Sequence, residues 1–285
     1  MRYVPPGHHK SVAAFREHLR SIDPALDCDP ELRGADGPLG RPLELGDRVI
    51  GNRFCAQPME GWDSTAEGMP SELTKRRWHR FGRSGAKLVW GGEAFAVAED
   101  GRANPRQLYM NPSADVAAGL ASLLCEIRTG HREIGEDPDE PVIGLQLTHS
   151  GRYSWPRDRA EPRIAYHHPL LDEMFAVPET PAILSDGELE AIGARFVELA
   201  RLAWQAGFHF VDVKCCHGYL LHELLGAKAR SGSYGGSFEN RTRLLRRIVA
   251  GIRSACPGLE VAVRVSLADV CPYAADPDSG IGVPR

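Results

Sequence analysis

Five apolar runs in this sequence each end in polar, titratable or glycine residues. In parallel α/β folds, ligands collect at the carboxyl ends of the strands. A strand that only supports the fold does not need titratable side chains at its end, so the repeated pattern indicates a binding site. The five segments cover residues 57–62, 91–94, 146–152, 214–219 and 264–266.

Common nucleotide and metal motifs do not accompany these segments. The sequence has no G-x-G-x-x-G after its first predicted strand and no G-x-x-x-x-G-K-[ST]. His149, His217 and His222 lack the spacing of an H-E-x-x-H pair, so we expect no metal site. The seven cysteines contain no C-x-x-C pair, and we expect reduced thiols, with Cys215 and Cys216 as small packing residues.

The residues around the five segments predict alternating strands and helices. Near-continuous apolar strands alternating with amphipathic helices favour a parallel α/β architecture, which a doubly wound sheet and a barrel satisfy equally. Ser185 and Glu188 form an S-x-x-E capping box that begins the longest helix, and Gly207 ends it. The predicted strands are 54–59, 87–92, 142–148, 208–213 and 260–266, and the predicted helices are 71–82, 115–128, 185–206 and 241–254.

The first forty or so residues differ from the rest in composition. They are rich in Pro and Asp and weakly periodic, with one short helix predicted over residues 10–22. A hairpin is predicted from Leu43 onward, with its turn at Gly46 and Asp47. We therefore expect an N-terminal extension over residues 1–42 and one α/β domain over residues 43–285.

Composition and charge limit the classes of partner. The chain has 285 residues, of which 42% are hydrophobic, and this is enough for one large domain. A formal net charge of -4 gives no electrostatic reason to expect nucleic acid or an anionic membrane. No apolar run reaches the ~18 residues of a membrane span, and the first residues have no apolar signal-peptide core. We expect a cytoplasmic protein that acts on a small molecule, and a homo-oligomer stays open.

The five strand ends resemble, in the same order, the motifs of the Old Yellow Enzyme family of NADH:flavin oxidoreductases. The resemblance extends over about residues 43–269. It implies a TIM (β/α)8 barrel with FMN lying across the carboxyl ends of its strands and NAD(P)H as the reductant. The motifs are NRFCAQPMEG, GGEAFAVAEDGR, GLQLTHSGR, VDVKCCHGYLLHELL with YGGSFENR, and VAVRVSLAD.

The resemblance also implies which residues contact the flavin. Gln146 would hydrogen-bond the pyrimidine edge, because an amide both donates and accepts. Arg264 would face flavin N1 and O2, where reduction builds negative charge. Both residues have a structural alternative, which is to satisfy buried backbone groups. The flavin-contacting positions are Pro58, Met59, Glu60, Ala94, Gln146 and Arg264.

Three residues of the fourth motif would act on the substrate. By the resemblance, His217 would hold the carbonyl oxygen of an enone-like substrate. Tyr219 would donate a proton to the carbon next to that carbonyl, while hydride leaves flavin N5. Lys214 takes the first of two positions, three residues apart, at which the family usually has an imidazole. Tyr219 and His217 could instead be ordinary loop residues that pack or hydrogen-bond locally.

Glu60 and Lys214 depart from the family pattern. The family usually has a small Thr or Cys where this chain has Glu60. A carboxylate beside a flavin that becomes anionic disfavours reduction unless it is protonated or neutralised. Lys214 is a point charge whose geometry differs from that of an imidazole. We expect Glu60 and Lys214 to lie close together and to offset each other's charge.

The number of predicted strands differs from that of a complete barrel. Five strands are predicted where the barrel has eight, and the phosphate site of such barrels follows strands seven and eight. We therefore expect about five of the eight βα units in this chain. Two functions follow: an FMN-dependent NAD(P)H oxidoreductase that reduces an electron-poor alkene, or a catalytically incomplete barrel fragment with weak or no flavin binding. A barrel hydrolase that uses the histidines is a remote third alternative.

Overall fold

The computed structural model describes residues 4–31, 33–46, 48–178, 183–268, 273–278 and 282–284. The chain divides into two compact units, Met1–Arg53 and Phe54–Arg285. The first unit holds helix α1 (Val12–Ile22) and the antiparallel hairpin of β1 (Leu43–Leu45) and β2 (Arg48–Ile50).

The hairpin of β1 and β2 belongs to the first unit. The Arg53 N–H donates to the Leu39 carbonyl at 2.8 Å, and this bond joins the end of the hairpin to the segment before it. The first compact unit ends at Arg53 and so includes this hairpin. Gly46 begins the predicted turn in the left-handed region, at φ 58°. Asp47, the other predicted turn residue, lies outside the described residues.

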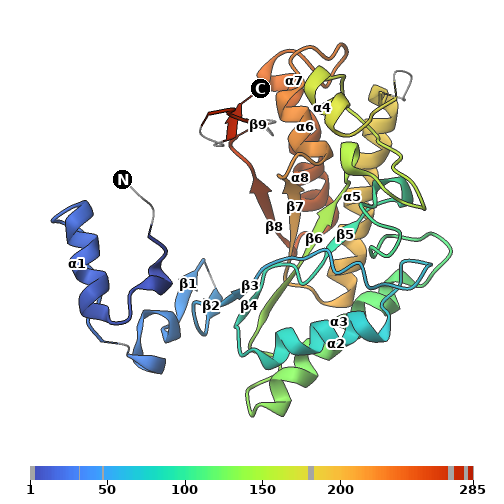
Figure 1. Cartoon of the computed structure of the whole chain (residues 1–285). Coiled ribbons are helices and arrows are strands. Elements are labelled where there is room, and N and C mark those ends of the chain that lie inside the picture. Colours follow the sequence, from blue (N-terminus) through green and yellow to red (C-terminus); the bar gives the residue numbers. More distant parts are fainter. Residues whose placement is uncertain are drawn as a thin grey trace. The chain divides into compact units, whose positions relative to one another are not determined.

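The second unit is built on a parallel sheet whose strands follow chain order (Figure 1). All neighbouring strands of this sheet pair in parallel, as in the wall of a (β/α)8 barrel. Strand β5 (Ala94–Ala96) pairs with β6 next to the end of β4. The strands, in order, are β3 (Cys55–Ala56), β4 (Leu88–Val89), β6 (Val142–Thr148), β7 (Phe210–Cys215) and β8 (Glu260–Val265). A separate antiparallel pair joins β9 (Tyr273–Ala275) to β10 (Gly282–Pro284).

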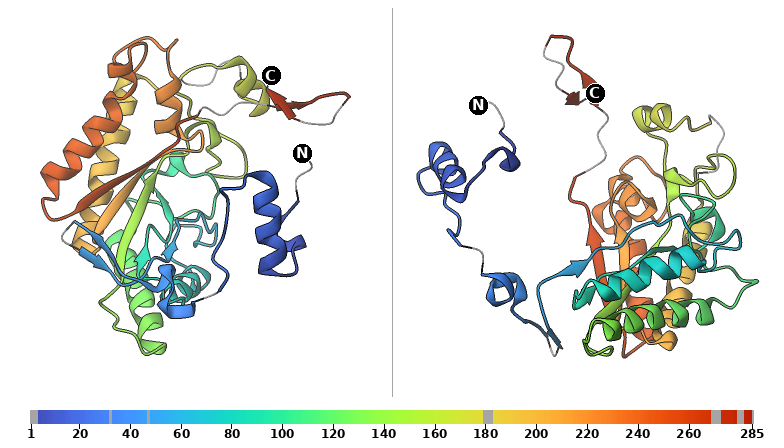
Figure 2. Two further views of the ribbon diagram at one scale, coloured as in Figure 1. Left: turned by 90° about the vertical axis from the view of Figure 1, so that its left-hand side faces the viewer. Right: turned by 60° about the horizontal axis from the view of Figure 1, so that its bottom comes forward.

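A row of helices flanks this sheet, in which α2 packs on α3, α3 on α5, and α5 on α8 (Figure 2). These four correspond to the four predicted helices. They are α2 (Glu72–Arg83), α3 (Val116–Glu133), α5 (Asp186–Ala206) and α8 (Arg243–Ala255). The short helices α4 (Pro169–Met174), α6 (Leu220–Gly226) and α7 (Phe238–Arg241) were not predicted as separate elements, because each is at most two turns long.

The two faces of the sheet differ in polarity. Successive side chains of a strand point to opposite faces. On β7, Val211, Val213 and Cys215 belong to the hydrophobic core that the helices complete. Asp212 and Lys214 alternate with them and are also buried, so they lie on the other face. That face is the one a barrel encloses, and it is where the candidate site is found.

The cap of α5 gives a first test of the fold. The Ser185 hydroxyl accepts the Glu188 N–H at 3.2 Å, and the Glu188 carboxylate accepts the Ser185 N–H at 2.8 Å. We expect Ser185→Ala to lower the free energy of unfolding by about 1 kcal/mol. Gly187 in the same turn has nothing within 4 Å of an added Cβ, so Gly187→Ala should raise it by about 0.5–1 kcal/mol. Denaturant titration measures both free energies. A Ser185→Ala variant as stable as the wild type would contradict the cap, and a less stable Gly187→Ala variant would contradict the open space at that position.

Candidate functional site

Most of the predicted site residues meet at the carboxyl end of the sheet. Ala94 pairs with Gln146 across β5 and β6, and Gln146 pairs with Asp212 across β6 and β7. Two residues further on, Lys214 pairs with Arg264 across β7 and β8. Because these residues share one face, the strands β6, β7 and β8 present polar side chains at one end of the sheet, next to Ala94 of β5.

The loop after β3 lies against these strand ends. The Ala94 N–H donates to the Met59 carbonyl at 3.2 Å. A Cβ placed on Gly91 would come within 2.9 Å of the Pro58 Cβ and 3.1 Å of the Gln146 Cβ, so only glycine fits there. The Met59 side chain is 47% exposed. Pro58, Met59 and Ala94 therefore lie close together, with Met59 offering an apolar surface.

Glu60 joins Lys214 to Tyr219. The Lys214 ammonium donates to Glu60 Oε1 at 2.7 Å, and the Tyr219 hydroxyl donates to Glu60 Oε2 at 2.8 Å. The Lys214 Nζ atom also lies 3.7 Å from the centroid of the Tyr219 ring, within cation–π range. The predicted proximity of Glu60 and Lys214 is confirmed, and the contact of Glu60 with Tyr219 was not foreseen.

Burial controls the electrostatics of this group. The side chains of Lys214 and Glu60 are only 5% and 11% exposed. Burial and the negative charge of Glu60 raise the pKa of the Tyr219 hydroxyl far above its usual value. Tyr219 is therefore a neutral phenol at physiological pH, and the paired charges of Glu60 and Lys214 cancel locally.

Gln146 and Asp212 form a second buried pair. The Gln146 amide nitrogen donates to Asp212 Oδ2 at 2.6 Å. Burial raises the pKa of the Asp212 carboxyl, and the bond from Gln146 partly opposes this rise. Since the amide nitrogen is engaged, the amide oxygen of Gln146 is the atom left to accept a bond from a ligand N–H.

The Arg264 guanidinium adds a cation beside this pair. Arg264 is half-buried, and within the described ranges no hydrogen bond or ion pair of its side chain is found. An isoalloxazine ring carries one imide N–H and gains negative charge at N1 and O2 on reduction. An amide oxygen and an unpaired cation match these needs, so Gln146 and Arg264 fit the ring of FMN.

His217 lies at the mouth of the site. Its backbone adopts φ 61°, a left-handed conformation that is uncommon for residues other than glycine. Its N–H donates to Ser266 Oγ at 3.3 Å, which ties the loop after β7 to β8. Partial burial and the nearby cations of Lys214 and Arg264 lower the pKa of the imidazole. A neutral His217 can still donate one hydrogen bond to a substrate oxygen.

A charged network that sequence reasoning missed anchors the Glu60 loop. The Gly61 N–H donates to Glu93 Oε1 at 3.1 Å, and the Arg77 guanidinium from α2 binds Glu93 through its Oε2. Arg77 also binds Asp63 at 2.9 and 3.0 Å. Burial raises the pKa of Glu93 to about 7. The only signal in the sequence was a carboxylate directly after two glycines at a strand end.

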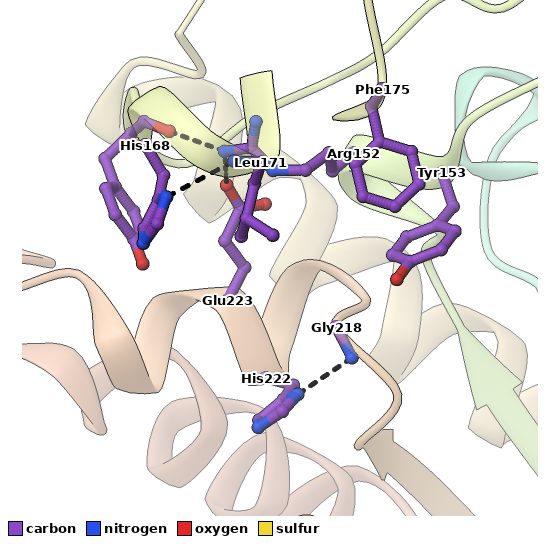
Figure 3. Close-up of a pocket in the computed structure, with 9 residues that line it drawn as sticks. Arg152, Tyr153, His168, Leu171, Phe175, Gly218, His222 and Glu223 are labelled. Atoms are coloured by element: carbon purple, nitrogen blue, oxygen red, sulfur yellow. Dashed lines mark hydrogen bonds and ion pairs between the residues drawn. The ribbon is translucent and has the colours of Figure 1, made fainter. Parts of the chain in front are cut away.

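A small cavity lies between Tyr153 and Phe175 on one side and Gly218 and His222 on the other (Figure 3). The Tyr153 ring lies 5.4 Å from the Tyr219 ring and packs edge-on against Phe175 at 4.4 Å. Arg152 and Glu223, which also line the cavity, form an ion pair at 2.6 Å. With a volume of about 50 Å³, the cavity has room for a small group or a few waters. Its lining residues are Arg152, Tyr153, Tyr166, His168, Leu171, Phe175, Gly218, His222 and Glu223.

The remaining candidates have structural surroundings. Cys215 faces the hydrophobic core, where burial raises the pKa of its thiol to about 12, and Cys216 is also buried. His149 and His222 accept backbone N–H bonds from Gly151 and Gly218. The burial of Cys215 and Cys216 agrees with packing roles for both cysteines. Within the described ranges, no group of three or more His, Cys, Asp or Glu residues could hold a metal ion, and no helix could span a membrane.

Known proteins resemble this chain over most of its length. The model of the NADH:flavin oxidoreductase / NADH oxidase family matches residues 38–276. The NADPH dehydrogenase of Geobacillus sp. is 30% identical over 242 residues, which are 81% of this chain and 64% of that protein. The NADPH dehydrogenase of Bacillus subtilis is 29% identical over 233 residues, with 80% and 63% covered. The chain thus spans slightly under two thirds of the length of these relatives.

Solved structures show the same fold. The Old Yellow Enzyme from Pichia sp. superposes with a TM-score of 0.65 at 23% identity, and the match covers 81% of this chain and 60% of that one. A 2-naphthoyl-CoA reductase superposes with a TM-score of 0.66 at 20% identity, covering 80% and 35%. The parallel strands in chain order are therefore part of a TIM barrel, as predicted. The chain belongs to the NADH:flavin oxidoreductase / NADH oxidase family.

Proposed function

We propose that this protein is an FMN-dependent oxidoreductase that takes hydride from NAD(P)H and delivers it to an electron-poor alkene. The observation that carries the proposal is the position of the Tyr219 hydroxyl. It is a neutral, buried proton donor that is bonded to Glu60, at the end of the sheet where Lys214 pairs with Arg264. Family membership supplies the flavin and the nicotinamide.

Each residue of the site would have its own role in the reaction. When bound, FMN supplies the hydride. Gln146 and Arg264 would hold its ring, with Pro58, Met59 and Ala94 at one side. His217 would donate a hydrogen bond to the acceptor's carbonyl oxygen, and Tyr219 would give a proton to the carbon next to that carbonyl. The cavity at Tyr153 would receive a small substituent of the substrate.

Two measurements on the purified chain test this function. The first is the stoichiometry of FMN bound to the full chain, followed by its absorbance. The second is anaerobic reduction of that FMN by NADPH or NADH and its reoxidation by a cyclic enone. We expect flavin binding and enone-dependent reoxidation. A chain that binds no FMN and is not stabilised by it would instead support the alternative of an incomplete barrel fragment.

Arg264 allows a sharper test of flavin placement. Removing its charge with Arg264→Met should lower the midpoint potential of the bound flavin, because the cation favours the reduced, anionic ring. A charged hydrogen bond contributes about 1.5–3 kcal/mol, which corresponds to about 30–60 mV for a two-electron couple. Anaerobic titration against a redox dye measures the potential. A matched change at the exposed Arg253, Arg253→Met, should leave it unchanged, and equal potentials in all three proteins would contradict the placement.

A further inference from the structure

Both oxygens of the Glu60 carboxylate are bonded to groups that carry protons. Oε1 accepts from the Lys214 ammonium at 2.7 Å, and Oε2 accepts from the Tyr219 hydroxyl at 2.8 Å. Lys214 and Tyr219 flank the end of β7, whereas Glu60 comes from the loop after β3. The fold thus brings together an ammonium, a carboxylate and a phenol in one continuous hydrogen-bonded chain.

This chain of groups is shielded from water. Tyr219 is 7% exposed, and the side chains of Lys214 and Glu60 are 5% and 11% exposed. The ammonium also rests on the Tyr219 ring, which limits its freedom to turn toward solvent. A phenol in this position, once it has lost its proton, regains one more readily from its bonded neighbours than from bulk water.

We propose that Lys214, Glu60 and Tyr219 form a proton relay that resupplies Tyr219 during the reaction. The inference rests on the proposed function, in which Tyr219 gives its hydroxyl proton to the substrate carbon while reduced flavin gives hydride to the neighbouring carbon. Lys214 then transfers a proton to Glu60, and the neutral carboxyl group turns about its Cγ–Cδ bond to donate it to the phenolate oxygen. The product has gained one hydride and one proton, and Lys214, left as a neutral amine, takes a proton from solvent.

The proton affinities run in the direction that the relay needs. Burial and the negative charge of Glu60 raise the pKa of the Tyr219 hydroxyl well above its usual 10.0. The buried phenolate is therefore a strong base, and it draws a proton from the groups that are hydrogen-bonded to it. Among the other titratable groups, Tyr153 acts on Tyr219, and the charges of Lys214 and Glu60 act on Cys216 and His217. Asp212, His222 and Arg264 act on Cys216 or His217 in turn.

Two substitutions break the relay while replacing each side chain by one of similar shape. Glu60→Gln introduces an amide that cannot pass a proton on, and Lys214→Arg keeps the cation on a group that does not release one. In the FMN-loaded full chain, we expect each to slow steady-state turnover with NAD(P)H and a cyclic enone about tenfold or more, because Tyr219 must regain its proton in every cycle. Reduction of the flavin by NAD(P)H and its first reoxidation by the enone are measured separately, so that a loss in proton resupply is distinguished from a loss in either half-reaction.

The solvent isotope effect separates a relay from a merely structural role. In mixtures of H2O and D2O, the wild-type steady-state rate with NAD(P)H and a cyclic enone should depend on deuterium content along a curve, because more than one proton moves in each cycle. Both variants should give a straight line. The exposed pair of Glu72 and Lys75 on α2, at 3.0 Å, provides matched controls, since Glu72→Gln and Lys75→Arg should keep the wild-type rate and the curve.

A second measurement requires no flavin. Tyrosine labelled with ¹³C at Cζ reports the ionisation of each ring by NMR, and Tyr219→Phe identifies the Tyr219 signal. We expect this signal to shift at the pH where Lys214 loses its proton, and we expect the shift to disappear in Lys214→Arg. The relay would be overturned by a Tyr219 signal whose pH dependence is the same in the wild type and in Lys214→Arg. It would also be overturned if both relay variants kept the wild-type rate and the curved isotope dependence. Alkene reduction would then still stand, whereas a loaded chain that reduces no enone would overturn the proposed function itself.

Discussion

Tyr219→Phe is expected to slow the reduction of an electron-poor alkene by about 100- to 10,000-fold, which is the usual contribution of a positioned general acid. The variant keeps the ring that carries the Lys214 ammonium but loses the hydroxyl that is proposed to protonate the substrate carbon. Reduction of the flavin by NAD(P)H should be unchanged, because the hydroxyl takes no part in it. Stopped-flow absorbance of the flavin measures the two half-reactions separately.

A second tyrosine provides the matched control for this variant. Tyr234 is also buried and hydrogen-bonded, with its hydroxyl 3.1 Å from Glu190, but it packs between α5 and α8. Tyr234→Phe should cost about 1 kcal/mol of stability and leave both half-reactions unchanged. If Tyr219→Phe slowed both half-reactions equally, the hydroxyl would be acting on flavin binding and not on proton transfer.

The sequence predicted the parts of the fold that local patterns determine. Strand β6 has the predicted bounds, Val142–Thr148, because an apolar run with polar neighbours on both sides leaves no other choice. Helix α5 starts after Ser185 and ends before Gly207, where a capping box and a left-handed residue stop the hydrogen-bond ladder. Short elements such as β3 and β5 were predicted poorly or missed, since two or three residues carry almost no periodicity.

For the site, the sequence predicted positions along the sheet but not the contacts between distant side chains. The order of the motifs placed Gln146, Lys214 and Arg264 at one end of the sheet, and register confirms it. The contact of Tyr219 with Glu60 could not be foreseen, because the two residues are 159 positions apart. No local pattern determines which oxygen of a carboxylate a distant side chain reaches. The contacts of Arg77 with Asp63 and Glu93 were not predicted for the same reason, since they join residues 14 and 16 positions apart.

The Glu60 and Lys214 departures have a common physical explanation. A carboxylate alone at this position would oppose the negative charge of a reduced flavin, and an ammonium alone would be an unpaired buried cation. At 2.7 Å each removes the penalty of the other. The pair therefore changes the polarity of the substrate side without changing its net charge, so a substrate assigned from relatives that lack the pair need not apply here.

Arg77→Met is expected to lower the free energy of unfolding by about 3–5 kcal/mol at pH 8, because it leaves Glu93 buried without its counter-ion. The loss should be smaller at pH 5. The pKa of Glu93 is raised to about 7 from its ordinary 4.5, so its burial costs nothing below pH 4.5 and becomes destabilising as the pH rises toward 7. Without Arg77 the pKa rises further, and the variant should lose at least about 1 kcal/mol more at pH 8 than at pH 5.

Adding Glu93→Gln to this variant isolates the carboxylate. The amide can still accept the Gly61 N–H but cannot ionise, so Arg77→Met with Glu93→Gln should regain stability at pH 8 and lose the difference between the two pH values. Denaturant titrations at both pH values measure this. An equal loss for the single variant at pH 5 and pH 8 would place the effect on Asp63, whose carboxyl pKa is lowered by the same guanidinium. The Glu60 loop would then depend on Asp63 and not on Glu93 for its position.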